Sequence, residues 1–291
     1  SFPTRRSSDL FLKAARKGGY AIGGYNTNNL EWTQALLTAA EAKKAPVLIQ
    51  TSMGAAKYMG GYKVIVDLVN NLIDSMGITV PVALHLDHGD YEAALECIEV
   101  GYSSVMFDGS HLPFEENLKL AKDVVEKAHA KGIAVECEVG SIGGEEDGII
   151  GAGELADINE CVQMVATGID SLACGIGNIH GVYPENWQGL AFDHLQAIAE
   201  AVGEDVPLVL HGGSGIPQEQ IEKAISMGIS KVNVNTEFQL SFAKATREYI
   251  EAGKDHEGKG FDPRKLLAPG KAAIIKDAEA HIDWFGSANK A

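Results

Sequence analysis

Three histidines of this chain are each followed directly by glycine, and each stands at the end of an apolar, strand-like run. They are His88, His180 and His211. A following glycine lets the backbone approach a ligand closely, and neutral imidazole suits zinc, cobalt, iron or manganese. Three histidines with an open fourth position form a catalytic zinc arrangement. The pattern predicts a metal site if the fold brings these three positions together.

Carboxylates also stand at the ends of these apolar runs. Asp87 adjoins His88 and could pass a proton to or from the same substrate. Asp108 and Glu138 end the two following runs, where they could hold a second cation or orient the histidines. The alternative for both is a helix cap or a solvated loop carboxylate. His85 lies further inside its run, and we expect it behind the ligands or in the core.

Small and polar residues after the later runs could bind an anion. In "HGGSG", backbone N–H groups and the Ser214 hydroxyl can point at one phosphate, and "NVNT" offers further donors. Tight turns explain most such glycines, so the prediction depends on their place beside the metal ligands. The candidate phosphate residues are Gly181, Gly212, Gly213, Ser214, Asn233, Asn235 and Thr236.

A long, glycine-rich and acidic segment, "GSIGGEEDGIIGAGE", follows the fifth apolar run. Such loops are commonly mobile lids that bring a catalytic group into the site on closure. Glu145 or Glu146 is therefore a candidate base, although either could simply be solvated.

Eight apolar, β-branched runs alternate with amphipathic helical patterns, with no linker between them. This predicts an α/β fold, a single-domain (β/α)8 TIM barrel over residues 11–291 with extra C-terminal helices. A doubly wound sheet is the alternative, but no run is followed by GxGxxG. In a barrel, chemistry gathers just past the carboxyl ends of strands, where these side chains stand. The runs are "YAIGGYN", "APVLIQTS", "VPVALHLDH", "SSVMFDGS", "IAVECEVG", "DSLACGIG", "VPLVLHGG" and "SKVNVNT".

Composition narrows the class of protein. The 291 residues carry a formal net charge of −16, which argues against nucleic acid or an anionic membrane as partner. Four separated cysteines predict reduced thiols and a cytoplasmic location. We find no apolar stretch of about twenty residues that could cross a membrane. The opening, residues 1–10, is no secretory signal and is expected to be a non-native or disordered leader.

Together these features predict an enzyme with an electrophilic metal, a flanking acid, a lid carboxylate and an anion site. That set suits making or breaking a bond next to the carbonyl of a sugar phosphate. A metal-dependent phosphatase or amidohydrolase would use similar parts, although amidohydrolases usually carry an HxH pair on the first strand, which "AIGGYN" lacks. From another class, a non-catalytic protein that binds metal and sugar phosphate is the alternative.

Seven motifs between about Gly19 and the C-terminus resemble one known family. They are "YNTNNLEWTQA", "LHLDHGDYE", "MFDGSHLPFEENL", "VECEVGSIGGEEDG", "GNIHGVYP", "LHGGSGIP" and "KVNVNTE". The chain resembles the class II fructose-1,6-bisphosphate aldolases of the shorter bacterial type, a family that includes tagatose-bisphosphate aldolases. The resemblance implies a zinc enzyme of glycolysis and gluconeogenesis, a homodimer or homotetramer. It would reversibly cleave a ketose bisphosphate, fructose rather than tagatose 1,6-bisphosphate, to dihydroxyacetone phosphate and glyceraldehyde 3-phosphate.

The resemblance also implies roles for single residues. His88, His180 and His211 match the zinc ligands of the family. Asp87 matches its proton donor at the C4 oxygen, and Glu146 matches the lid carboxylate that moves the proton at C3. The positions assigned to a second divalent metal, or to zinc in a resting state, correspond to Asp108 and Glu138.

The substrate positions follow in the same way. Ser52 matches a serine near the glyceraldehyde-phosphate end, and Arg264 is our candidate for the distal phosphate, reached across a subunit interface. Surface ion pairing is the alternative for Arg264. A Schiff-base aldolase is the mechanistic alternative, but no lysine ends the sixth run, and Lys231 begins the eighth. The dihydroxyacetone-phosphate site, beside which the family often binds K⁺ or Na⁺, corresponds to Gly181, Gly212, Gly213, Ser214, Asn233, Val234, Asn235 and Thr236.

Overall fold

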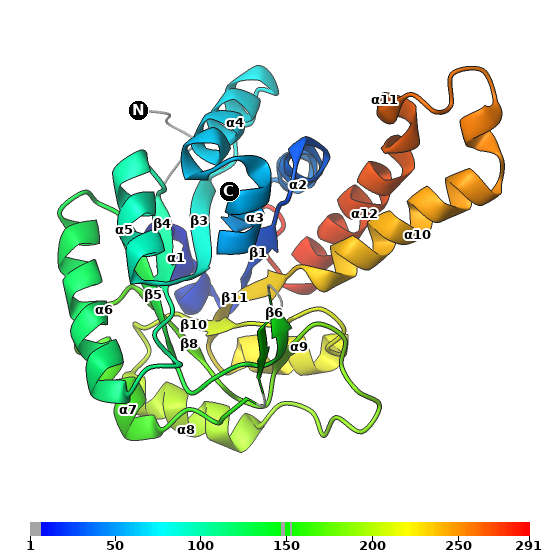
Figure 1. The fold of residues 1–291 in the computed structure, drawn as a ribbon. Coiled ribbons are helices and arrows are strands. Elements are labelled where there is room, and N and C mark those ends of the chain that lie inside the picture. Colours follow the sequence, from blue (N-terminus) through cyan, green and yellow to red (C-terminus); the bar gives the residue numbers. More distant parts are fainter. Residues whose placement is uncertain (1–6, 147–148, 152) are drawn as a thin grey trace.

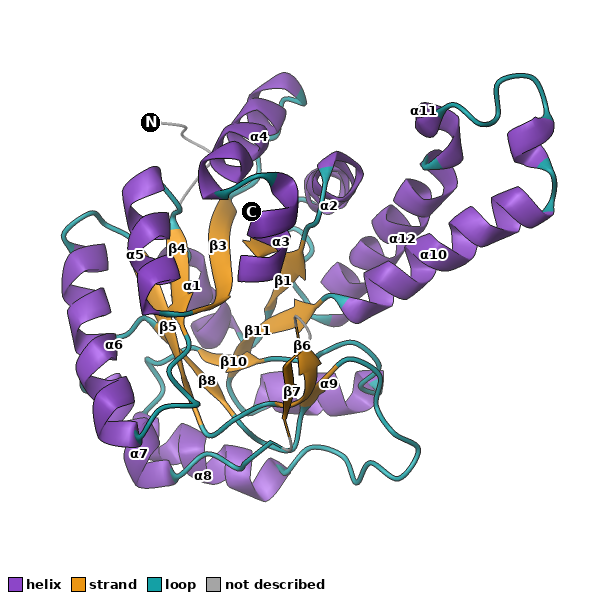
Figure 2. Ribbon diagram, viewed as in Figure 1, coloured by secondary structure: helices purple, strands orange, loops and turns teal. Residues whose placement is uncertain are grey.

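Eight parallel strands close into a barrel, which confirms the predicted (β/α)8 architecture (Figure 1, Figure 2). Around the ring the order is β1-β11-β10-β8-β5-β4-β3-β2, so each strand lies beside its neighbour along the chain and the last pairs with the first. The computed structural model describes residues 7–146, 149–151 and 153–291, with 146 and 149–151 as backbone only. The barrel strands are β1 (Ile22–Asn26), β2 (Val47–Thr51), β3 (Val82–Gly89), β4 (Ser104–Phe107), β5 (Ala134–Val139), β8 (Ser171–Cys174), β10 (Leu208–Leu210) and β11 (Ile229–Val234).

Helices cover the outside of the barrel, so its strands are enclosed on both faces and are apolar nearly throughout. Every residue of the eight strands is buried except His88. Within the described chain, no helix combines the length and the apolar character that crossing a bilayer would need. The helices that follow the strands are α2 (Leu30–Lys43), α3 (Met53–Met59), α4 (Tyr62–Ser75), α5 (Tyr91–Val100), α6 (Phe114–His129), α7 (Ile158–Val165), α8 (Phe192–Val202) and α9 (Gln218–Ser226).

Short polar side chains turn the chain sharply from strand into helix. Ser52 follows β2 and accepts a hydrogen bond from the Ala55 N–H, while Asp90 follows β3 and accepts one from the Ala93 N–H. Each side chain satisfies an otherwise unpaired N–H in the first turn of a helix. Because the turns are tight, the residues just before them stay at the mouth of the barrel.

The acidic segment after β5 forms a β-hairpin of β6 (Gly143–Glu146) and β7 (Ile149–Gly151). Strand β6 also pairs in parallel with β9 (Ile179–His180), with Gly144 opposite His180. The segment predicted to be a lid is thus held by backbone hydrogen bonds against the segment that carries a predicted metal ligand.

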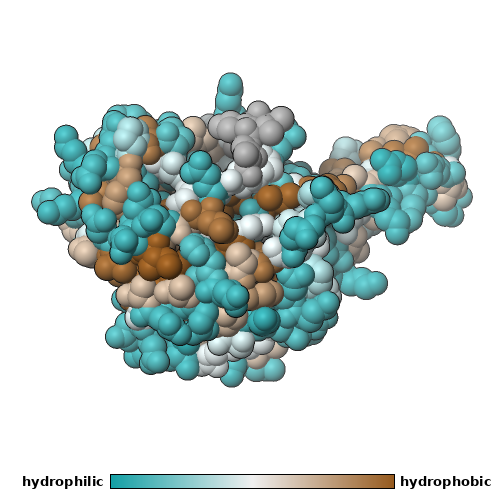
Figure 3. Space-filling view, turned by 90° about the horizontal axis from the view of Figure 1, so that it is seen from below, coloured by the Kyte–Doolittle hydropathy of each residue, from teal (hydrophilic) through white to brown (hydrophobic). Residues whose placement is uncertain are grey.

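The extra C-terminal helices form an arm that projects from the side of the barrel (Figure 1, Figure 3). It consists of α10 (Thr236–Glu251) and α12 (Ala268–Trp284), with η1 (Lys254–His256) and α11 (Pro263–Leu266) at its outer end. Within α10, all of which is described, only Phe238 is buried. Leu240, Ile250 and Phe261 are exposed apolar residues on this arm.

Helix α1 (Asp9–Gly18) closes the amino-terminal end of the barrel. Its buried face packs on the first halves of β1, β2 and β3, and the Ser8 hydroxyl bonds to that of Ser104 at 2.8 Å. The fold therefore begins before the expected boundary at residue 11, because Asp9 and Leu10 belong to α1 and Ser8 is buried. For residues 1–6, which lie outside the described chain, the leader stays an expectation. The packed residues are Phe11, Leu12, Ala15, Ile22, Leu48 and Ala83.

Candidate active site

The three glycine-flanked histidines converge at the carboxyl end of the barrel. His88 Nε2 lies 3.2 Å from His180 Nε2 and 2.8 Å from His211 Nδ1. Four-coordinate zinc with Zn–N bonds of about 2.05 Å separates its ligand nitrogens by about 3.3 Å. These three nitrogens, all within 4.8 Å of one another, therefore fit one ion. His88 has a φ of 47°, an uncommon conformation for a residue with a side chain and one that clusters at functional sites.

Carboxylates orient two of the three rings. His88 Nδ1 is 2.6 Å from Asp108 Oδ2, and His211 Nε2 is 2.9 Å from Glu136 Oε1. A carboxylate on the far nitrogen fixes the ring and raises its basicity as a metal ligand. Burial lowers the pKa of His211 well below its usual value, and lowers that of His180 to about 2, so both rings are neutral. Burial acts in the same direction on His88, but the charges of Asp87 and Asp108 and the Asp108 hydrogen bond raise its pKa well above the usual value.

A second group of possible metal donors shares His88 and adds Asp108 and Glu138. Glu138 Oε1 accepts a 3.3 Å bond from the Ile142 N–H, whereas Oε2 is buried without a hydrogen-bond partner among the described residues. Burial, followed by the charge of Asp108, raises the pKa of Glu138 well above its usual value. Such an orphaned buried oxygen is costly unless a proton or a cation satisfies it. The donor set therefore fits a second cation better than a solvated loop carboxylate.

Asp87 is buried at the same mouth and is held from both sides. Its Oδ2 accepts a 2.9 Å bond from Asn26 Nδ2, and its Oδ1 accepts a 3.2 Å bond from Asn233 Nδ2. Burial would raise the pKa of Asp87, but the charges of His88 and Lys231 and the Asn26 hydrogen bond lower it. The carboxylate is therefore ionised and able to accept a proton. Sequence reasoning missed Asn26, although it ends the first strand just as the predicted site residues end theirs.

A small cavity joins Asp87 and His180 to the predicted phosphate residues. Asn26 and the amino end of α10 complete its lining. The Ser214 hydroxyl accepts from the N–H groups of Asn235 and Glu237 at 3.3 and 3.1 Å, which ties the loop after β10 to that helix end. A helix amino terminus favours an anion because its N–H groups are unpaired and its dipole is positive there. The predicted phosphate residues that line the cavity are Gly181, Gly212, Ser214, Asn233, Asn235 and Thr236.

Five other predicted residues do not line this cavity, or their side chains lie outside the described part of the chain. Gly213 and Val234 stand next to lining residues but are not part of the lining, and the Ser52 hydroxyl caps α3. Arg264 lies in α11 at the outer end of the arm, where its side chain is 88% exposed and pairs with Asp262 (Figure 1). The structure does not bring Arg264 into the cavity of its own chain. For Glu146 the backbone in β6 is described, and its side chain lies outside the described part.

Sequence reasoning also missed a polar group inside the barrel, below the histidines. Lys231 Nζ donates to Glu136 Oε2 at 2.7 Å and lies 3.2 Å from His85 Nε2. His85 Nδ1 in turn bonds to the Ser104 hydroxyl at 2.7 Å. His85 is expected behind the predicted ligands or in the core, and the structure buries it fully inside the barrel. A signal existed, because Glu136 lies inside the fifth run and Lys231 near the start of the eighth, and both are charged residues among mostly apolar neighbours.

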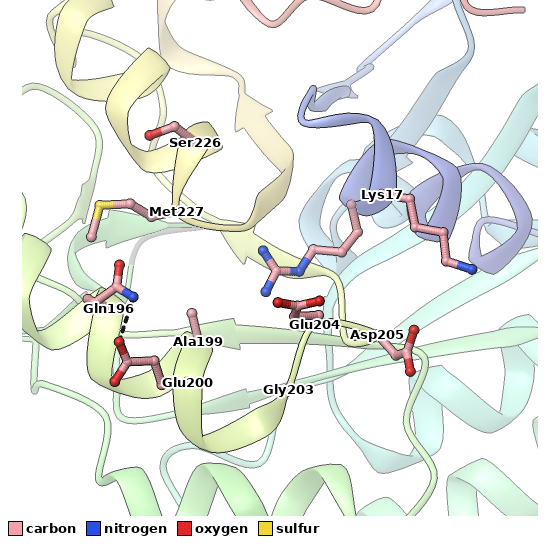
Figure 4. A pocket seen from close by; sticks show the side chains of 10 residues that line it. Lys17, Gln196, Ala199, Glu200, Gly203, Glu204, Asp205, Ser226 and Met227 are labelled. Carbon is pink, nitrogen blue, oxygen red and sulfur yellow. Dashed lines mark hydrogen bonds between the residues drawn. The ribbon is translucent and has the colours of Figure 1, made fainter.

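A larger hollow, of about 660 Å³, lies elsewhere on the molecule (Figure 4). It is lined from α1, α8, the loop before β10 and the end of α9, all at the amino-terminal end of the barrel. Lys17, Glu200, Glu204 and Asp205 give it a mixed charge. Because the histidines and Asp87 stand at the opposite end, the smaller cavity is the candidate active site.

A parallel barrel whose carboxyl ends carry three metal-competent histidines, an ionised aspartate and an anion loop defines the class of metal-dependent (β/α)8 enzymes. Comparison with known families makes the assignment specific. The family model described as "Fructose-bisphosphate aldolase class-II" matches residues 7–290. The chain belongs to the class II fructose-bisphosphate aldolase family, whose members are lyases and are in general zinc-dependent.

Related proteins and solved structures agree with this family. The fructose-bisphosphate aldolase of Streptococcus pneumoniae serotype 4 is 68% identical over 290 residues, which cover 98% of this chain and 99% of that protein. That of Mycoplasma pneumoniae is 53% identical over 282 residues, 96% and 97% of the two chains. The crystal structure of a putative fructose-1,6-bisphosphate aldolase from Coccidioides immitis matches with a TM-score of 0.87 at 35% identity, over 98% of each chain. The YdjI aldolase from Escherichia coli K12 matches with a TM-score of 0.83 at 33% identity, over 99% of each chain.

Proposed function

We propose that this chain reversibly cleaves fructose 1,6-bisphosphate to dihydroxyacetone phosphate and glyceraldehyde 3-phosphate, with zinc held by His88, His180 and His211. The observation that carries the proposal is the convergence of these three nitrogens beside the ionised Asp87. The family and its fructose-bisphosphate aldolase relatives support the same substrate. The reaction belongs to glycolysis and gluconeogenesis and would take place in the cytoplasm.

Asp87 is the base that starts cleavage. It takes the proton of the C4 hydroxyl while the C3–C4 bond breaks, so C4 becomes the aldehyde carbon of glyceraldehyde 3-phosphate. The electron pair of the broken bond stays on C3 of the dihydroxyacetone moiety. When bound, zinc supplies a Lewis acid that polarises the C2 carbonyl and favours this redistribution of charge. The hydrogen bonds from Asn26 and Asn233 hold the carboxylate in position for the transfer.

Glu146 then delivers a proton to C3 and completes dihydroxyacetone phosphate. Its strand, β6, pairs with the segment that carries His180, so the backbone of the hairpin already borders the metal ligands. Proton transfer by a placed carboxylate is typically worth about 10²–10⁴ in rate.

The phosphate of the dihydroxyacetone moiety binds to the predicted phosphate residues that line the cavity. Ser214 and the amino end of α10 support this, since both line the cavity and the Ser214 hydroxyl accepts from the Glu237 N–H of that helix end. A K⁺ or Na⁺ ion beside this phosphate would offset part of its charge. A second divalent metal would take Asp108 and Glu138, supported by the orphaned oxygen of Glu138.

The active assembly is a homodimer or a homotetramer. The projecting arm supports this, because α10 buries only Phe238 and leaves apolar side chains exposed. In such an assembly Arg264 would bind the distal phosphate in the site of a neighbouring subunit. Ser52 stays assigned to the glyceraldehyde-phosphate end through its place after β2.

The test is cleavage of fructose 1,6-bisphosphate, followed by triose-phosphate detection before and after EDTA treatment and after zinc is added back. We expect chelation to abolish activity and zinc to restore it. Activity that survives chelation and is lost to borohydride trapping would contradict the proposal, because it would indicate a lysine imine. Faster cleavage of tagatose 1,6-bisphosphate in a parallel assay would contradict the assignment to fructose.

A further inference from the structure

A buried ion pair lies in the interior of the barrel, below the predicted metal ligands. The side chains of Lys231 and Glu136 are 0% and 1% exposed, and their charged atoms are 2.7 Å apart. Replacing such a pair by apolar residues of similar volume is often neutral or stabilising, so its presence calls for a reason other than stability. The contacts of the pair supply one, because Glu136 also touches a metal ligand.

The direction of each hydrogen bond around Glu136 follows from its chemistry. Lysine can only donate and a carboxylate can only accept. Glu136 Oε2 accepts from Lys231, so Oε1 accepts from His211 Nε2 at 2.9 Å, and that nitrogen must carry the ring hydrogen. In a neutral ring, His211 Nδ1 then carries no hydrogen. This is the nitrogen that lies 2.8 Å from His88 Nε2, among the metal donors.

Lys231 keeps Glu136 ionised, as the acceptor of the hydrogen bond from His211 Nε2. The lysine supplies the opposite charge inside the barrel, where a lone carboxylate would be costly. Its second contact, His85 Nε2 at 3.2 Å, must accept, so His85 carries its hydrogen on Nδ1 and donates it to the Ser104 hydroxyl at 2.7 Å. Through His85 the hydrogen bonds run outward from the lysine, whereas at Glu136 both Lys231 and His211 donate to the carboxylate. Neither partner of Lys231 can reverse its own bond while the ammonium group is present.

We propose that Lys231 and Glu136 act as a positioning pair that fixes the tautomer of His211, with hydrogen on Nε2, and so makes Nδ1 its metal-binding atom. The inference rests on the proposed zinc site for its consequence, but the tautomer itself is a property of the metal-free chain. Neither residue touches substrate, and both act only through His211.

Glu136→Gln tests the positioning pair with a side chain of nearly the same shape as glutamate. Lys231 can still only donate, so it takes the amide oxygen and leaves the amide NH₂ facing His211 Nε2. That nitrogen must then accept, and the ring hydrogen moves to Nδ1. We expect ¹⁵N-histidine NMR of the metal-free protein to show His211 changing from the Nε2–H to the Nδ1–H form. Zinc affinity, measured by competition with a chromophoric chelator, should fall about 10–100-fold, as is typical when such a partner is lost.

The double variant Glu136→Gln, Lys231→Met separates positioning from damage to the core. Without the ammonium group the amide can turn, present its oxygen to His211 Nε2 and restore the original tautomer. We expect the double variant to regain most of the zinc affinity that Glu136→Gln loses. Ser104→Ala, at the far end of the chain of bonds, should leave the His211 tautomer unchanged. Circular dichroism would confirm that all three variants fold.

An unchanged His211 tautomer in folded Glu136→Gln would overturn the inference. The inference would also be overturned if the double variant bound zinc more weakly than Glu136→Gln. Damage to the core alone predicts that the double variant has the lower zinc affinity. If the tautomer changes and zinc affinity does not, the tautomer assignment stands and His211 is removed from the proposed zinc site. The failure of the positioning pair and that of the zinc site are thus distinguishable.

Discussion

At the scale of single residues, the site depends on an irregularity in β3. Successive side chains of a regular strand point to opposite faces, so Asp87 and His88 should not both reach the barrel mouth. His88 adopts a φ of 47°, and both side chains lie there, 4.0 Å apart between Asp87 Oδ1 and His88 Nε2. The sequence predicts both residues from their chemistry. It does not predict this backbone conformation, because no glycine or turn motif marks position 88 itself.

Replacing Asp87 should separate catalysis from metal binding. We expect Asp87→Ala to keep its zinc and to lower kcat for fructose 1,6-bisphosphate by at least about 10²-fold, since a general base is lost while the histidine nitrogens stay. Zinc content and steady-state kinetics measure the two effects. Asp90→Ala is the control, because Asp90 caps α5 and should lower stability by about 1 kcal/mol without lowering kcat. Turnover near that of the parent in Asp87→Ala would remove Asp87 from the mechanism.

At the scale of elements, the strands and their polar ends could be predicted, and the pairing between loops could not. All eight barrel strands fall on the predicted runs because continuous apolar sequence reports burial on both faces. The segment predicted as a lid also pairs with β9, through two residues of each strand. Such short pairs arise from distant parts of the chain meeting, and local pattern does not encode them. The ion pair of Glu136 and Lys231 was not predicted for the same reason. A local sequence pattern indicates which face of a strand a residue occupies, but not which residue it contacts.

Pairing of the hairpin with β9 makes Gly144 sensitive to substitution. A Cβ at this position would lie 2.0 Å from the His180 carbonyl oxygen, and its φ of 87° disfavours a side chain. We expect Gly144→Ala to separate β6 from β9, displace His180 and lower zinc affinity. Gly132→Ala is the matched control, because its φ is 68° with open space around the new methyl. Equal zinc affinity in the two variants would show that the hairpin does not support His180.

The end of α2 should contribute a stability that depends on pH. Burial raises the pKa of Glu41, but hydrogen bonds from Lys44, Thr79 and Val80 outweigh it and lower the pKa to about 2. A carboxylate with a depressed folded pKa stabilises the fold above its unfolded pKa, and loses that effect as the pH falls through the folded value. We expect Glu41→Gln to be less stable than the parent at neutral pH.

This difference should narrow as the pH falls from about 4.5 toward about 2. Urea unfolding of both proteins across that range measures it. Glu92→Gln, at an exposed position on α5, controls for the change in net charge. A difference that stays constant with pH would show that the ionised form of Glu41 is not responsible.

At the scale of the whole molecule, packing within one chain does not explain why the arm projects and exposes apolar side chains. The sequence predicts helices after the eighth unit, because their amphipathic pattern is local. It does not predict that α10 and α12 leave the barrel, since that depends on what they pack against (Figure 2). A side chain 88% exposed at the outer end, Arg264, has no phosphate-binding role within its own subunit in this arrangement.

Mixed oligomers would show whether Arg264 serves a neighbour. We expect Arg264→Ala to raise KM for fructose 1,6-bisphosphate and Asp87→Ala to abolish turnover. In a dimer that contains one subunit of each variant, one site combines an intact Asp87 with the intact Arg264 of the other chain. Differently tagged subunits, purified as the mixed dimer, should therefore regain the parental KM. A mixed dimer that keeps the KM of Arg264→Ala would show that Arg264 does not act in the site of a neighbouring subunit.

The proposed zinc ligands come from both halves of the chain, and this has a practical consequence. Asp87 and His88 precede the loop at Gly132, while His180 and His211 follow it, and a Cβ added at Gly132 would meet nothing within 4 Å. A chain cut there yields two fragments, each with part of the ligand set and neither with all three histidines. Zinc-dependent cleavage of fructose 1,6-bisphosphate would then occur only when the two fragments associate. The barrel could thus be turned into a split reporter, in which fusing each fragment to one of two test proteins converts their encounter into enzyme turnover.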